Sequence, residues 1–299
     1  MKNKTSKTIN DKRLPSFSEL LRKPITEVNG YLEYVKALYE EWCACDGKGY
    51  PTFETLHNCF PNLNSNLPPQ FFTGDINSKV VMISLNSHAG DDNPGAEIDA
   101  TPFCRTWENY LHFWTNFAYE RYAPKGCAAH LIEGVSNFDR KLHRFLNGNA
   151  GDVTCSDLAR WNIFHVELCP IPSSQFNINA AGMDCLENLL LRTLEAVAAT
   201  SRSLVLVLNN PVCRMLKRLA KKKVISIDQQ ERPLGKVSAR LNGRRIDYKV
   251  SLDGKRLVDI VAVPTFANQA LNGVLLETYN LLAFTDNERA IIRDAIGVK

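Results

Sequence analysis

The chain has 299 residues, 44% of them hydrophobic and 23% charged, which is the composition of a globular protein with a sizeable core. No apolar run approaches the roughly 20 residues of a membrane-spanning helix, so we expect no membrane partner. The formal net charge of +4 and the pI of about 8.5 are compatible with a polyanionic partner but do not identify one.

The N-terminal residues 1–27 are basic and lack the apolar stretch of a secretory signal. They predict a flexible basic tail ahead of one domain of residues 28–299; an arm that contacts nucleic acid is the alternative. The nine cysteines are odd in number and irregularly spaced, which without an export signal predicts reduced thiols and a cytoplasmic location. Cys43 and Cys45 have no second pair at zinc spacing, and no glycine-rich nucleotide-binding string occurs, so we expect no metal and no cofactor.

Four apolar runs predict buried strands, because they are rich in β-branched residues and too short for buried helices. They cover residues 80–85, 161–169, 203–208 and 257–263. Helical patterns are expected at residues 28–45, 100–122, 137–147 and 183–200, and in a short basic helix that ends at Lys223. Asn-Gly at 242–243 and Asp-Gly at 253–254 predict hairpin turns, and therefore a β-meander over residues 237–252. This layout predicts an α/β fold: a single doubly wound domain with a four-stranded, mostly parallel central sheet flanked by helices and an added β-meander.

A polar loop is expected directly after the first strand, and it contains Asn86, His88, Asp91 and Asp92. In an open α/β sheet, ligands bind outside the carboxyl ends of the strands. An amide, an imidazole and two carboxylates at that place suit the positioning and activation of a water molecule. The alternative interpretation is a turn made of turn-forming residues.

Two more candidate binding residues lie close to the ends of predicted elements. Phe103 precedes the helical run near Trp107, where a flat ring is placed to stack on a flat ligand, although aromatic residues at this spacing usually form core. Glu167 lies near the carboxyl end of the second strand among apolar neighbours, where a carboxylate is costly unless it is paired or used. In the alternative interpretation, this carboxylate is structural and is held by an arginine or by backbone N–H groups.

Basic residues cluster in the short helix before Lys223 and again around Arg244. They are Lys217, Arg218, Lys221, Lys222 and Lys223, followed by Arg240, Arg244 and Arg245. Such a run is either a solvated helix face or a set of phosphate contacts.

The order of these loops resembles the order of motifs in the uracil-DNA glycosylase superfamily, over roughly residues 70–285. Residues 84–90, SLNSHAG, stand in place of the family's first motif, a Gly-x-Asn-Pro-Gly loop, with Ser84 for its glycine and Ser87 for its proline. Residues 167–174, ELCPIPSS, look like the family's base-recognition strand. Residues 263–266, VPTF, stand in place of the final His-Pro-Ser-Pro motif, whose histidine this chain lacks.

The resemblance implies a monofunctional DNA glycosylase, which flips a nucleotide out of double- or single-stranded DNA and hydrolyses its N-glycosidic bond to leave an abasic site. We expect this enzyme to be a monomer. The implied catalytic residues are Asn86, which holds the attacking water, His88, Asp91 and Asp92. The implied base-binding residues are Phe103, Glu167, Ser173 and Ser174. The implied DNA contacts are Lys222, Arg244, Thr265, Asn268 and the duplex-wedging Leu271.

The resemblance also bears on which base is removed. Glu167 falls at or beside the place of the asparagine that reads uracil in uracil-specific members. An ionised carboxylate only accepts hydrogen bonds, so it favours the N4 amino group of cytosine and repels the O4 of uracil. Some members defend against phage by excising glucosylated hydroxymethylcytosine, and this modified cytosine is the substrate that we expect. The alternatives are a uracil or mismatch glycosylase in repair, another α/β hydrolase, and a nucleic-acid-binding module without catalysis.

Overall fold

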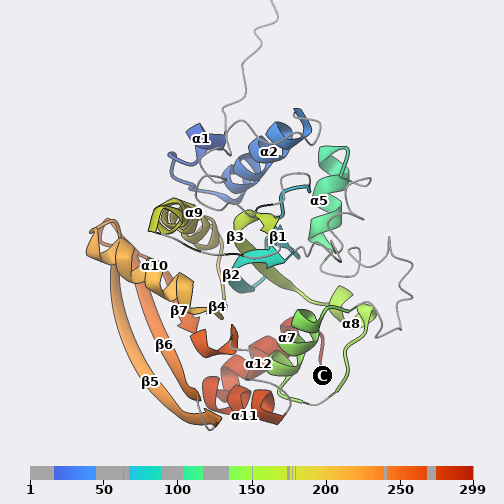
Figure 1. Ribbon diagram of the computed structural model, residues 1–299, viewed down its shortest axis with the longest axis vertical. Coiled ribbons are helices and arrows are strands. Elements are labelled where there is room, and N and C mark those ends of the chain that lie inside the picture. The colour runs from blue at the N-terminus through green and yellow to red at the C-terminus, as the bar shows by residue number, and fades with distance from the viewer. Residues whose placement is uncertain are drawn as a thin grey trace, which may run out of the picture.

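One mixed sheet runs through the part of the chain that the structure, a computed structural model, describes: residues 17–44, 63, 67–88, 104–116, 135–149, 151–173, 176, 178, 180–238, 241–267 and 274–298. Its seven strands stand in the order β1-β3-β2-β4-β7-β6-β5 (Figure 1). They are β1 (Phe72–Thr73), β2 (Val80–His88), β3 (Ile163–Ser173), β4 (Leu204–Val207), β5 (Ser226–Ser238), β6 (Leu241–Leu252) and β7 (Lys255–Ala262). The α/β class predicted from the sequence is confirmed.

Four neighbouring strands, β3, β2, β4 and β7, are parallel to one another. They coincide with the four apolar runs, so the four predicted strands are confirmed in place. The sheet is larger than predicted, because β7 also pairs antiparallel with β6, and β6 with β5. The predicted meander is therefore an extension of the central sheet and shares β7 with it.

The hairpin of β5 and β6 is longer than predicted, with strands of 13 and 12 residues. The Asp-Gly turn is confirmed: Asp253 and Gly254 join β6 to β7 with φ of 51° and 75°, and a two-residue turn with positive φ at both positions favours this dipeptide. The turn predicted at Asn242-Gly243 is wrong. Gly243 lies inside β6, where it pairs with Gly235 of β5, so the ladder continues past this dipeptide.

Helices cover both faces of the sheet. One face carries α1 (Phe17–Leu20), α2 (Val28–Ala44), α5 (Trp107–Thr115), α9 (Ala180–Ala198) and α10 (Asn210–Lys221). The other carries α7 (Asn137–Asn147), α8 (Cys155–Ala159), α11 (Val274–Ala283) and α12 (Asp286–Ala295). In Figure 1, α1, α2 and α9 lie above the sheet and α7, α11 and α12 below it.

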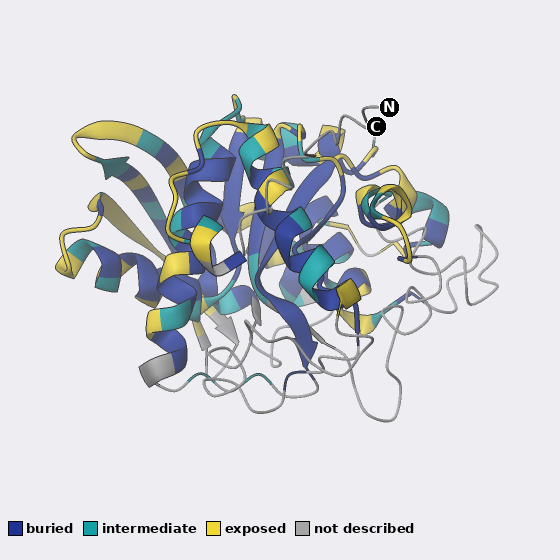
Figure 2. Ribbon diagram, turned by 90° about the horizontal axis from the view of Figure 1, so that it is seen from above, coloured by how far each residue is buried: buried dark blue, intermediate teal, exposed yellow. Residues whose placement is uncertain are grey.

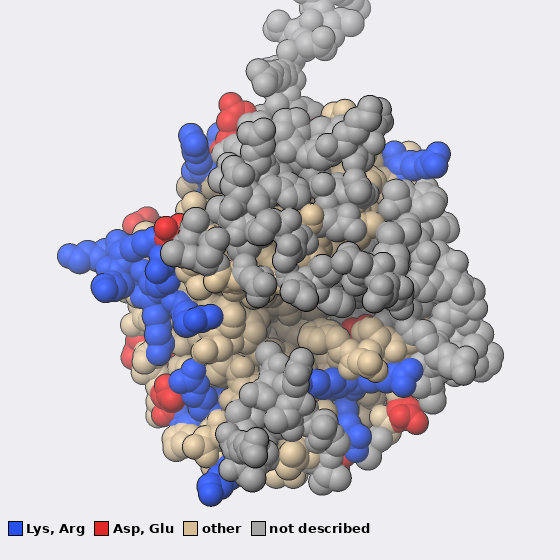
Figure 3. Space-filling model, in the orientation of Figure 1, with Lys and Arg blue, Asp and Glu red and all other residues tan. Residues whose placement is uncertain are grey.

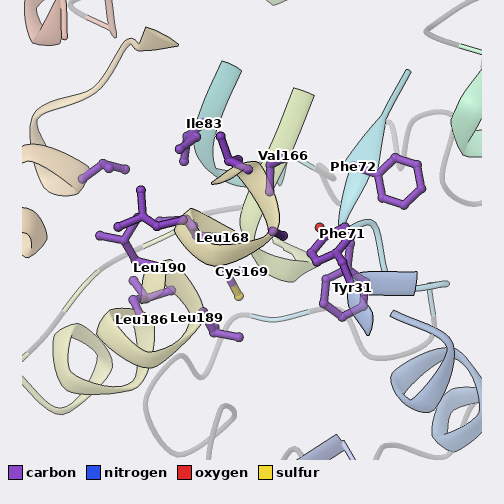
Figure 4. Close-up of a cluster of buried hydrophobic side chains, with 14 of the residues drawn as sticks. Tyr31, Phe71, Phe72, Ile83, Val166, Leu168, Cys169, Leu186, Leu189 and Leu190 are labelled. Carbon is purple, nitrogen blue, oxygen red and sulfur yellow. The ribbon is translucent and has the colours of Figure 1, made fainter. Parts of the chain in front are cut away.

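The central strands are buried on both sides, which is why their sequences are continuously apolar (Figure 2). Along β2, Val81 and Ile83 face the α2 and α9 side, whereas Val80 and Met82 face the α7 side. Figure 4 shows the first of these cores, where Ile83 and Val166 meet the leucines of α9 and Tyr31 of α2.

Capping residues explain where two of the predicted helices begin and end. The predicted helix over residues 137–147 is confirmed as α7, which begins after Ser136, whose hydroxyl accepts from the Asp139 N–H, and ends at the left-handed Gly148. The basic helix α10 begins after Asn209, whose side chain accepts from the Val212 N–H. No helix among the described residues is long and apolar enough to cross a membrane.

The two strands that carry the expected site are longer than predicted. The ladder between β2 and β3 continues through Asn86 opposite Cys169 and, after a bulge, His88 opposite Ser173. The prediction that a loop begins at Asn86 is therefore wrong for the backbone of residues 86–88. β3 runs through Pro170, which lies beside the bulge in the β2–β3 ladder, and the carbonyl of Pro170 accepts from the Gln70 N–H at 2.6 Å.

The predicted tail also differs in its last part, residues 17–27. The ring of Phe17 is buried and lies 4.7 Å from the ring of Tyr34. The Ile25 N–H donates to the buried carboxylate of Glu195 at 2.7 Å. These residues belong to the folded body, because burial of two apolar side chains holds them there.

Candidate functional site

The parallel strands end at two different levels, which leaves a step along the carboxyl edge of the sheet. β4 and β7 end side by side, with Val207 opposite Ala262. Val207 is also level with Ile83 of β2, which is opposite Val166 of β3. β2 and β3 continue beyond this level. His165 and Glu167, on either side of Val166, have side chains on the sheet face that α7 covers.

His165, Glu167 and Ser84 form a polar cluster at this step. The Nε2 atom of His165 lies 2.7 Å from Ser84 Oγ and 3.4 Å from Glu167 Oε1. The His165 and Glu167 side chains are only 7% and 6% exposed. The strands bring the three together because Ser84 is directly opposite Glu167, and because His165 is two residues before Glu167 on the same face of β3. The carboxylate is thus paired with an imidazole instead of an arginine.

The contacts of His165 with Ser84 and with Glu167 use the same ring nitrogen, Nε2. In a serine–histidine–acid relay the imidazole uses one nitrogen for the serine and the other for the acid, so this cluster is not that arrangement. It offers a hydroxyl, an imidazole nitrogen and a carboxylate within one small volume. Such a set suits the reading of a ligand's polar edge, and it can also hold or move a proton.

Aromatic rings lie directly beside the polar cluster. Phe138, in the first turn of α7, is 47% exposed, and its ring lies nearly parallel to the His165 ring, with centroids 6.4 Å apart. The same ring meets Phe266 edge-on, with centroids 6.3 Å apart. Phe266 is buried in the short helix η3 (Pro264–Ala267), which follows β7 directly. An exposed flat ring at this place is a platform on which a flat ligand can stack.

A lysine completes this group of residues. Lys141 lies one turn after Phe138 on α7, and its Nζ atom is 5.0 Å from the centroid of the Phe266 ring. Burial lowers the pKa of Lys141 below its ordinary value of 10.5. Figure 3 shows the molecular surface hollowed in the middle of this face, next to the region of α7 in Figure 1. We call Ser84, Phe138, Lys141, His165, Glu167 and Phe266 the edge cluster.

The predicted water-binding residues lie just beyond the edge cluster along β2. The backbone of Asn86 is two residues past Ser84 and pairs with Cys169, and that of His88 pairs with Ser173. Ser173 is buried, at 2% exposure. The side chains of Asn86 and His88 lie outside the described residues, as do Asp91, Asp92, Phe103, Ser174, Asn268 and Leu271.

Three predicted DNA contacts have partners within the protein. Lys222 Nζ donates to Glu187 Oε2 at 2.6 Å and to Asp184 Oδ1 at 2.9 Å. Arg244 donates to Asn210 Oδ1 at 3.0 Å. Thr265, in η3 and half-buried, shares a hydrogen bond with the hydroxyl of Tyr279. These predictions stay untested, since none of these contacts excludes a rearrangement on DNA.

The sequence interpretation missed His165, Phe138 and Lys141. A usable signal existed for His165, because a histidine two residues before a strand carboxylate lies on the same face of the strand. Phe138 and Lys141 gave no signal in the sequence. At helical spacing, an aromatic side chain usually packs in the core and a lysine usually lies on a solvated helix face.

The chain has no match among models of known protein families, among curated proteins or among solved structures. Among the described residues, no group of three or more histidine, cysteine or acidic side chains is placed to hold a metal ion. The chemistry of the site therefore follows from the geometry of the edge cluster.

Proposed function

We propose that this protein is a DNA glycosylase that hydrolyses the N-glycosidic bond of a flipped-out modified pyrimidine and leaves an abasic site. Glucosylated hydroxymethylcytosine in phage DNA is the proposed substrate, with a cytoplasmic monomer as the acting form. The observation that carries the proposal is the edge cluster: a buried acceptor, Glu167, paired with His165 beside the exposed ring of Phe138.

The sheet supports this proposal at the level of architecture. A resemblance to the uracil-DNA glycosylase superfamily leads us to expect four adjacent parallel strands with helices on both faces. β3, β2, β4 and β7 are four such strands, and helices cover both of their faces. The edge cluster lies where β4 and β7 end, and ligands of open α/β sheets bind at such strand ends.

The contacts of Glu167 support a cytosine-type base. A flipped base stacked on Phe138 would present its polar edge to the His165–Glu167 pair. The carboxylate would accept from the exocyclic N4 amino group, which uracil lacks. Ser84 Oγ, 2.7 Å from the imidazole, is a second polar atom for the same edge.

Bond cleavage in such a reaction builds positive charge on the sugar and negative charge on the leaving base. We propose that His165 stabilises the charge on the base, because its ring lies beside the stacking platform. Asn86 remains the proposed holder of the attacking water, since its backbone follows Ser84 by two residues along β2. His88, Asp91 and Asp92 remain proposed helpers in that step.

The test is to incubate the protein with duplexes that contain glucosylated hydroxymethylcytosine, hydroxymethylcytosine, uracil or cytosine, and to measure strand breaks after alkali. We expect breaks at the glucosylated base. Glu167→Gln should lower kcat/KM by about 10- to 100-fold, because one hydrogen bond to a base edge is worth about 1–3 kcal/mol. Glu33→Gln, on the exposed face of α2, is the matched control.

Two outcomes would overturn the proposal as stated. One is release of uracil with none of the cytosine derivatives, and the other is a Glu167→Gln protein with unaltered base preference. Thermal melting of each variant shows whether it is folded.

A small-molecule hydrolase is the second candidate, favoured by the 2.7 Å contact between Ser84 and His165. Two results together would establish that candidate. A fluorophosphonate should label the unsubstituted protein but not Ser84→Ala, and the unsubstituted protein should release no base.

A further inference from the structure

Lys141 is the charged member of the edge cluster's α7 side, and neither base reading nor water activation gives it a role. It shares one face of α7 with Phe138, because residues three apart on a helix are neighbours. Both contact Phe266: Phe138 through a T-shaped arrangement of the two rings, and Lys141 through an ammonium that lies 5.0 Å from the centroid of the Phe266 ring. The amine and the stacking platform thus lie side by side.

The surroundings of Lys141 suit a nucleophile better than a simple phosphate contact. Its side chain is half-buried against a ring that is itself only 1% exposed, and this burial disfavours the ammonium form, so the pKa is lowered. An amine that loses its proton more easily has a larger fraction with a free electron pair at neutral pH. Lysines that form Schiff bases are activated by this kind of desolvation.

We propose that Lys141 attacks the sugar after the base has left, and so gives the site a strand-cleaving step on its own abasic product. The protein would then be bifunctional, in contrast to the monofunctional glycosylase that the resemblance implies. A base stacked on Phe138 would place its C1′ at the rim of the platform, beside this amine. The inference rests on the proposed function for the source of the abasic sugar. Water remains the nucleophile of the excision step, and the lysine acts in the next one.

The reaction balances without any added oxidant or reductant. The Nζ electron pair attacks C1′ of the ring-opened deoxyribose aldehyde, and loss of water gives an imine. Glu167 or His165, the proton acceptors of the edge cluster, takes a proton from C2′, and those electrons expel the 3′ phosphate. Hydrolysis of the imine returns the free lysine and leaves an unsaturated sugar on the 5′ fragment.

The experiment supplies abasic DNA that has been prepared beforehand, so that it does not depend on base excision by this protein. The full chain is mixed with that DNA and with sodium borohydride, which reduces an imine to a stable amine link. We expect a covalent protein–DNA adduct on a denaturing gel, and strand cleavage when borohydride is left out. Peptide mapping of the adduct should place the link on Lys141.

Lys141→Arg is the decisive variant, because arginine keeps the positive charge but does not act as an amine nucleophile. We expect loss of the adduct with little change in affinity for abasic DNA, and an unchanged adduct in Lys255→Arg, an exposed lysine at the opposite end of β7 from Phe266. An adduct that persists in Lys141→Arg, or its absence from unsubstituted protein that binds the DNA, would overturn the inference. Trapping on prepared abasic DNA together with no release of any base would instead leave the inference standing and refute the glycosylase.

Discussion

Arg245 shows how a single residue links the extended sheet to the helices behind it. Arg245 is 7% exposed, and its guanidinium donates to both carboxylate oxygens of Glu288 in α12, at 2.6 and 2.8 Å. It also donates to Asp247 and to the carbonyl oxygen of Ala283 in α11. A buried charge is costly unless it is paired and hydrogen-bonded, and here every side of the guanidinium fork has an acceptor. Arg245 therefore holds β6 against the C-terminal helices.

This cluster predicts a specific dependence of stability on pH. Burial by itself would raise the pKa of Glu288, but hydrogen bonds from Arg245 and from the Thr285 N–H outweigh it and lower the pKa below the ordinary 4.5. A lowered folded pKa gives stability that is present above the unfolded pKa and is lost as pH falls through the folded pKa. Urea unfolding should show that Glu288→Gln is less stable than the unsubstituted protein at pH 7 by about 1–3 kcal/mol. When the pH is lowered below 4.5, the variant should lose less stability than the unsubstituted protein loses.

The control for this prediction is Glu277→Gln, which alters the more exposed pair between Arg144 and Glu277. We expect a smaller loss there, because exposed pairs contribute little. An acid dependence in Glu288→Gln equal to that of the unsubstituted protein would contradict the role of the Arg245 cluster.

At the scale of the element, α10 divides its basic side chains between two faces. Arg218 and Lys222 point to α9, where both contact Glu187, a carboxylate only 3% exposed, and Asp184. Arg214, Lys217 and Lys221 lie on exposed positions of the same helix. Figure 3 shows Lys and Arg side chains gathered over the region of α10, on the same face as the hollow. The first face is paired with carboxylates of α9, and the second is exposed to solvent.

The two faces should respond differently to neutralisation. Replacing Arg214, Lys217 and Lys221 with glutamine should weaken binding to all DNA sequences alike and flatten the salt dependence, because phosphate contacts carry no sequence information. Replacing Arg218 and Lys222 should instead lower the urea midpoint, because Glu187 then stays buried without its cations. Binding titrations over a salt series, with urea unfolding of both triple and double variants, test this. An unchanged salt slope in the triple variant would make its face a solvated surface only.

For the whole molecule, stability should be distributed unevenly across the sheet. β2 and β4 are covered on both faces by separate apolar cores, whereas most side chains of β5 are exposed. Hydrogen exchange followed by mass spectrometry should find the slowest amides in β2 and β4. Those of β5 should exchange at least about tenfold faster, since strands with few buried contacts open locally without global unfolding. Equal protection in the two regions would show that the hairpin and the parallel core unfold as one unit.

The sequence was sufficient to predict the parallel core because burial on both faces leaves a continuous apolar run at each strand. It was insufficient for strand ends, since Asn86 and His88 look like loop residues and the pairing with β3 overrides that local preference. The Asn-Gly signal at 242–243 failed for the same reason, since Gly235 and Gly243 pair within the ladder.

The candidate site was predictable only in part. Glu167 stood out from the sequence because a carboxylate in an apolar strand needs a partner. Its partner His165 could have been found as well, because it lies two residues earlier on the same face of β3. The ring of Phe138 depends on how α7 packs against β3, which is a contact between residues far apart in the chain. Spacing within one element carries no information about such a contact.

The two borders of the sheet have a consequence for how this protein behaves when it is concentrated. β1, at one border, has only two residues, and β5, at the other, carries Pro233, which has no N–H to offer, beside a register shift and the charged residues Glu231 and Arg232. A strand this short, or one interrupted by proline and charge, is a poor template for the addition of a strand from a second molecule. Among the residues that the structure describes, neither border of the sheet therefore favours edge-to-edge aggregation.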